Sequence, residues 1–160
     1  MTIEAIAKTA TKILVQQGFH TPTILMEGIS KFGVIGLADL PSESDERIRF
    51  MYQIGEQAVR EHSIGVLRQV FFVSESWMGS TFSTDGSGKK RYVRPSLDPN
   101  RIEVLTITCF NPSTEESTIG ILEIIRNANH EIVELKKVDV GDGKGKDNLL
   151  PAFVAGYHST

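Results

Sequence analysis

Residues 102–140, IEVLTITCFNPSTEESTIGILEIIRNANHEIVELKKVDV, decide the fold. They contain three runs with the β-branched and aromatic composition of strands, at Ile102–Phe110, Thr118–Arg126 and Glu131–Val140. The connections between these runs are short and rich in Asn, Pro and Ser, and connections of this kind join antiparallel neighbours. The sequence therefore predicts an antiparallel meander of three strands in this part of the chain.

A further strand precedes the meander. The segment Val66–Trp77 contains the run VFFV at residues 70–73, in which apolar side chains fall on both faces of an extended chain. A strand that is apolar on both faces is usually covered on both sides. We therefore predict that Val66–Val73 is an interior strand of the sheet.

The first third of the chain predicts two helices around a strand pair. Residues 3–17 place apolar side chains on one helical face, and Gly18 follows as a C-terminal cap. The short apolar runs Thr23–Met26 and Val34–Ala38 predict the strand pair. A second helix is predicted over Ser42–His62, because hydroxyl and acidic side chains gather at its start. The side chains predicted to face the sheet are those of Met51, Tyr52, Ala58 and Val59.

These elements follow the order α-β-β-α-β-β-β-β, which belongs to the α+β class. We expect a mostly antiparallel mixed sheet of about six strands with two helices packed on it, in a single domain over residues 1–160. The segment Gly79–Arg101 shows no regular period and is predicted to be a long irregular loop. From about residue 141 onward the sequence predicts a flexible, weakly apolar tail.

Composition and charge narrow the classes of partner. The chain has 160 residues, 40% of them hydrophobic, and a net charge of -3, so it has no general attraction to nucleic acid or to an anionic membrane. No run approaches the roughly 18 apolar residues that a membrane helix needs, and we see no signal peptide. We therefore expect a cytoplasmic protein without a membrane partner.

Known catalytic and metal-binding motifs are absent from the sequence. The single cysteine, Cys109, lies at alternating spacing within a strand and is interpreted as a buried, inert thiol. No phosphate-binding glycine loop and no Cys-x-x-Cys motif is present. We therefore expect no metal and no cofactor. None of the histidines falls at ligand spacing with another; they are His20, His62, His130 and His158.

One pair of residues resembles the chemistry of metal-dependent nucleases. Glu134 and Lys136 lie on the same face of a predicted strand, where a carboxylate and an amine can hold Mg²⁺ and orient water. The further acids would come from Glu75 and from Asp98 or Glu103. The same Glu-x-Lys pattern also protects the edge of a sheet, and we favour that interpretation.

The long segment Gly79–Arg101 is the most unusual feature, because structureless loops of this length tend to be functional or disordered. It follows Trp77, the only tryptophan, and carries four cations around one aromatic side chain. Cations and an aromatic ring can bind a phosphate backbone and stack on a base. They can equally form a solvated connection, an arm between subunits or a catalytic lid. The candidate ligand- or partner-binding residues are Trp77, Lys89, Lys90, Arg91, Tyr92 and Arg94.

Three functions follow from these observations. The favoured hypothesis is a non-catalytic binding or assembly domain, which meets a protein partner or a further copy of itself through the basic loop and a sheet edge. The second is an enzyme of unrecognised type that acts on phosphates or nucleic acid, although nucleic acid is not the favoured partner of an acidic chain. The third is a structural subunit of a larger particle.

Overall fold

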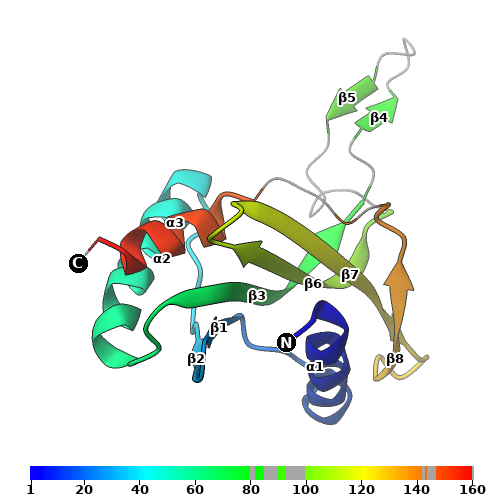
Figure 1. Cartoon of the computed structure of the whole chain (residues 1–160). Helices are drawn as coiled ribbons and strands as arrows, with labels where there is room; N and C mark the ends of the chain where they lie inside the picture. Colours follow the sequence, from blue (N-terminus) through cyan, green and yellow to red (C-terminus); the bar gives the residue numbers. More distant parts are fainter. Residues whose placement is uncertain (80–81, 85–89, 93–99, 142, 144–146, 160) are drawn as a thin grey trace.

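Six strands form one open antiparallel sheet in a computed structural model that describes residues 1–79, 82–84, 90–92, 100–141, 143 and 147–159 (Figure 1). The order across the sheet is β2 (Phe32–Gly36), β1 (Thr23–Gly28), β3 (Leu67–Met78), β6 (Ile102–Asn111), β7 (Glu116–Arg126) and β8 (Ile132–Val138). Every pairing within it is antiparallel. The prediction of the α+β class is confirmed. The sheet was expected to be mixed, but its described pairings are all antiparallel.

The predicted interior strand is confirmed. β3 lies between β1 and β6, and the four residues at positions 70–73 are all buried. Val70 and Phe72 pack into the core on one face of the sheet, while Phe71 and Val73 pack into the core on the other. The run 70–73, which is apolar on both faces of the strand, is therefore covered by helices on both sides of the sheet.

One face of the sheet is covered by α1 (Ile3–Gln17), which was predicted with the same bounds. Its start is capped by the hydroxyl of Thr2, which accepts a hydrogen bond from the backbone N–H of Ala5 at 3.1 Å. Its end is capped by Gly18 with a φ of 83°, a left-handed conformation that glycine adopts without strain. The buried stripe of α1 packs on β6 and β8, and Ile6, Ala10 and Leu14 form it.

The other face carries two helices, α2 (Ser44–Glu61) and α3 (Leu149–Tyr157) (Figure 1). Only α2 was predicted, and the number of helices in the described residues is three rather than two. The predicted flexible tail thus contains a helix from Leu149 to Tyr157. The carboxylate of Asp147 caps it by accepting hydrogen bonds from the N–H groups of Leu149 and Leu150, at 2.9 and 3.3 Å. No helix formed by the described residues is long and apolar enough to cross a membrane.

Glycine brings α2 and α3 into backbone contact. A Cβ added to Gly55 of α2 would overlap the carbonyl oxygen of Phe153, and a Cβ added to Gly156 of α3 would overlap that of Tyr52. Met51 and Ala58 are buried as predicted, but Tyr52 is 37% exposed. The prediction that Tyr52 packs on the sheet is wrong, because its side chain is exposed and belongs to neither core, while its main chain contacts α3.

The segment Gly79–Arg101 is not wholly irregular. β4 (Phe82–Thr84) and β5 (Lys90–Tyr92) pair antiparallel as a separate two-stranded sheet, with Ser83 opposite Arg91. Figure 1 shows this pair standing apart from the six-stranded sheet. Each of these strands has only three residues, which is too short for the alternation that predicts a strand from sequence.

Candidate functional site

Trp77 is a surface residue at the far end of β3. Its side chain is 42% exposed, and the guanidinium carbon of Arg101 lies 4.5 Å from its ring centroid. This is a cation–π contact, in which the guanidinium group occupies one face of the indole ring. The candidate residue Trp77 is therefore paired with Arg101, which immediately precedes β6.

The basic residues of the long segment are only partly described. Lys90, Arg91 and Tyr92 form β5, of which the backbone is described. Lys89 and Arg94 lie outside the described residues. The prediction that these side chains act together on a ligand stays a prediction.

Two of the acids considered for an enzymatic site, Glu103 and Glu75, are engaged in other contacts. Arg126 donates to Glu103 through Nε at 2.6 Å and through a terminal nitrogen at 3.3 Å, in a two-point ion pair. This contact raises the pKa of Arg126. One carboxylate oxygen of Glu75 accepts the backbone N–H of His20 at 3.1 Å, which ties the entry of β1 to β3. Asp98 lies outside the described residues.

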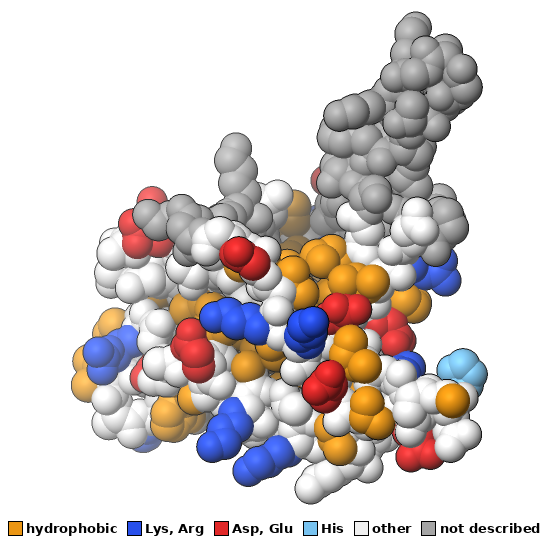
Figure 2. All heavy atoms as spheres, turned by 90° about the vertical axis from the view of Figure 1, so that its right-hand side faces the viewer, with side chains coloured by type: hydrophobic (Ala, Val, Ile, Leu, Met, Phe, Trp, Pro, Cys, Tyr) orange, Lys and Arg blue, Asp and Glu red, His pale blue; other side chains and the backbone are white. Residues whose placement is uncertain are grey.

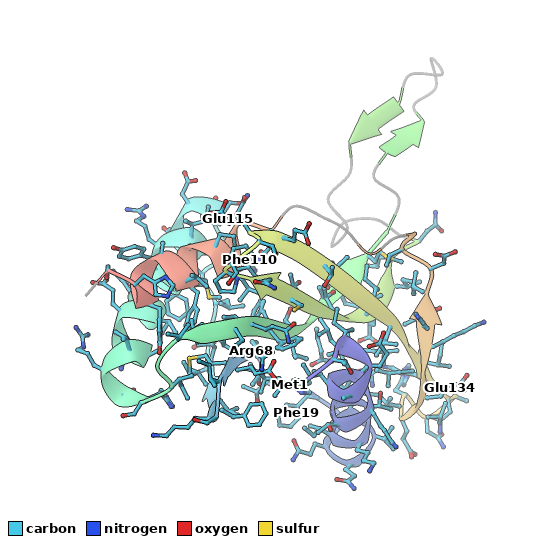
Figure 3. All side chains as sticks on the ribbon, in the orientation of Figure 1. Met1, Phe19, Arg68, Phe110, Glu115 and Glu134 are labelled. Carbon is cyan, nitrogen blue, oxygen red and sulfur yellow. The ribbon has the colours of Figure 1, made fainter. Side chains whose placement is uncertain are left out.

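Glu134 and Lys136 lie on β8, the last strand at one edge of the sheet. Both side chains are exposed, and Lys136 is the cross-strand neighbour of Glu123. Figure 3 shows Glu134 on the outer strand, well away from the middle of the sheet. Among the described residues no three His, Cys, Asp or Glu side chains gather as a metal site would require. The described residues therefore do not form the nuclease-like site that the Glu134 and Lys136 pattern suggested.

A cavity of about 710 Å³ lies between the start of α1 and the sheet. Gly120 forms part of its floor, where a Cβ would come within 2.7 Å of the Ile3 methyl group. Residues 138–141 and Gly143 line one side, and the Gly143 carbonyl accepts the N–H of Ile119 at 2.6 Å. The cavity thus lies among the first residues of α1, the first half of β7 and the end of β8.

A chain of hydrogen bonds runs from the wall of this cavity, where Cys109 and Gln69 lie, to Glu27. The thiol of Cys109 donates to the Gln69 side-chain oxygen at 3.3 Å, and the Gln69 amide donates to Glu27 at 2.7 Å. Burial raises the pKa of Cys109, although a hydrogen bond with Thr118 lowers it in part. No buried side-chain nitrogen or oxygen of the described residues lacks a partner. The wall therefore presents a protonated, satisfied thiol, as the sequence predicted for Cys109, and it is a poor nucleophile.

Because the pKa of the Cys109 thiol is raised, we predict that the stability of the protein depends on pH in the alkaline range. The unfolded thiol ionises near its ordinary pKa of 9.0, whereas the folded thiol ionises only at higher pH. The stabilising contribution of the neutral thiol is therefore complete below the unfolded value and is lost as pH rises through the folded value. We expect the wild type to lose stability relative to Cys109→Ser as the pH rises through 9.0 and beyond, as measured by urea unfolding. A difference that stays constant over this range would contradict the assignment.

β2 is the other edge of the sheet, and within the described part of the chain only β1 pairs with it. The hairpin bonds that flank β1 and β2 run from Gly28 N–H to Lys31 C=O at 2.9 Å and from Leu37 N–H to Pro22 C=O at 2.8 Å. Since hydrogen-bonded pairs alternate along an antiparallel ladder, the odd-numbered residues of β2 bond to β1. The N–H and C=O groups of Phe32, Val34 and Gly36 therefore point outward.

The same residues of β2 present apolar side chains to solvent. Phe32 is 62% and Val34 59% exposed, and both lie on the face of the sheet that carries α1. Phe19, in the connection from α1, adds a third apolar side chain that is 56% exposed. Figure 3 shows Phe19 in the space between β2 and α1 in this view. We call Phe32, Val34, Gly36 and Phe19 the β2 edge surface.

The two edges of the sheet differ in their protection. β8 carries Glu134, Lys136 and Lys137, and charged side chains on an edge strand discourage pairing with another chain. Figure 2, viewed from the side of β8, shows acidic and basic side chains spread over this face. The sequence of β2, FGVIG, contains no charge and no proline. This difference was the available signal for the β2 edge surface, which the sequence reasoning had left unnamed.

Comparisons with known proteins add no family: no family model, no curated protein and no solved structure matches this chain.

Proposed function

We propose that this chain is a non-catalytic assembly domain, which binds a protein partner by accepting an extended strand at β2. The observation that carries the proposal is the unprotected edge, where Phe32, Val34 and Gly36 offer outward main-chain groups. Strand addition uses such groups for affinity and the adjacent side chains for specificity. The exposed rings of Phe32 and Phe19 supply the apolar contact that this mode of binding needs.

The contrast between the edges supports this choice of surface. A natural sheet blocks the edges that must not pair, and β8 has the charges that do so. An edge strand without charges leaves apolar side chains and unpaired backbone groups in contact with solvent. Binding of a partner strand covers both. By comparison, Trp77 already has Arg101 as a partner, and Glu103 already has Arg126.

A photo-crosslinking amino acid at Val34 tests the proposal in the cells from which the chain comes. The matched control is the same amino acid at Val133, an exposed valine of the charged edge strand that is 52% exposed. We expect a covalent adduct from position 34 and little from position 133, because a crosslinker on β2 lies next to the strand that β2 accepts. Equal labelling from the two positions would overturn the proposal.

A further inference from the structure

We propose that the strand accepted by β2 is the β2 of a second copy, paired antiparallel about a two-fold axis that passes beside Val34. The two sheets then join into one. This inference rests on the proposed function and names the partner of the same edge. It is carried by the register of β2, by an unexplained glycine and by the charges at the ends of the strand.

The outward backbone groups fix the register. In an antiparallel ladder, residues whose N–H and C=O groups point at the partner stand opposite each other and exchange two hydrogen bonds. A pairing centred on Val34 sets Val34 opposite its own copy and Phe32 opposite Gly36. This is the one two-fold pairing in which all three outward residues of β2 find partners within β2.

Gly36 has no structural need to be glycine within one chain. Its φ is not in the left-handed range, and a Cβ there would meet only the Thr21 methyl group, at an ordinary 3.9 Å. Gly33 differs, because a Cβ there would come within 2.5 Å of Met26. In the two-fold pairing Gly36 lies opposite Phe32, and an aromatic ring packs well over a cross-strand glycine. The second copy thus accounts for both the exposed Phe32 and the small residue that faces it.

The ends of β2 carry opposite charges. Lys31 precedes the strand and Asp39 follows it, and both are exposed. An antiparallel pairing brings the beginning of one β2 next to the end of the other. Lys31 of each copy therefore approaches the end that carries Asp39 of the other, and the two contacts are equivalent by symmetry.

A charge-swap at the two-fold position tests the inference. Because Val34 faces its own copy, Val34→Lys places two lysines opposite each other, and Val34→Glu places two carboxylates there; like charges in direct opposition destabilise a strand pair. An equimolar mixture of the two variants restores an attractive pair. The control is Val133→Lys, which makes the same change on the charged edge β8.

Light scattering during size-exclusion chromatography reads the result. We expect the wild type and Val133→Lys to have twice the chain mass at high concentration. Each Val34 variant alone should dimerise at least about tenfold more weakly, and the mixture should recover the dimer. Unfolding of the dilute variants should match that of the wild type, since Val34 is exposed in one chain.

Two outcomes would overturn the inference. A wild type that stays monomeric at every concentration removes the second copy as the partner, and a mixture that fails to dimerise removes the pairing about Val34. Neither result decides the proposed function, because crosslinks from position 34 to a different protein would still support it. Absence of all crosslinks from position 34 would instead remove the proposed function itself.

Discussion

Replacing Met51 with Asp is expected to unfold most of the protein at room temperature. Met51 is fully buried in the same apolar core as Leu150 and Phe153, and no Lys or Arg is buried among the residues that the structure describes. A carboxylate there loses its hydration without gaining a partner, which costs at least about 4 kcal/mol and approaches the whole stability of a small domain. Urea unfolding followed by circular dichroism measures the change.

The matched control is Met51→Leu. This substitution nearly conserves volume and apolar character, so we expect it to cost less than about 1.5 kcal/mol. A Met51→Asp protein with the unfolding midpoint of the wild type would show that α2 does not form this core.

The second large effect is expected at the contact between α2 and α3. A Cβ at Gly55 would meet the Phe153 carbonyl and would lie 2.8 Å from the Tyr157 backbone nitrogen. Both are main-chain atoms of a packed helix, so no side chain can turn aside and α3 must move. We expect Gly55→Ala to lower stability by about 2–3 kcal/mol, although alanine gains about 1 kcal/mol in helix propensity.

Gln53→Ala is the control for Gly55→Ala, because Gln53 is an exposed residue of the same helix. We expect its effect to lie within about 0.5 kcal/mol of zero. Calorimetry compares the two variants, and a Gly55→Ala protein that melts at or above the wild-type temperature would contradict the close approach of the helices.

The sequence predicts the interior of this fold and its first helix better than its C-terminal helix and its edges. The run at residues 70–73 shows its double burial directly in its composition. In α3, Pro151 and Gly156 hide the helix, since both residues usually interrupt one. Pro151 is the third residue of α3, where its missing N–H has no helical partner to lose, and Gly156 is required by Tyr52.

The candidate site was less predictable for a geometric reason. Trp77 was identified by its rarity, but its contact with Arg101 depends on the β3–β6 register, in which Trp77 stands opposite Glu103. Register between strands is a long-range property that an apolar pattern does not fix. The second strand was expected at Val34–Ala38 and is found at Phe32–Gly36, so the outward residues could be named only from the ladder itself.

The pairing of β3 with β6 also has a consequence for how the chain can evolve. Met78 and Ile102 are cross-strand partners, so the chain leaves the sheet and returns to it at the same point. The entropy of closing such an excursion grows only with the logarithm of its length, by roughly 0.6 kcal/mol for each doubling. Residues 79–101 can therefore lengthen, shorten or change composition while the ladder on either side stays intact, and selection can act on this segment almost independently of folding.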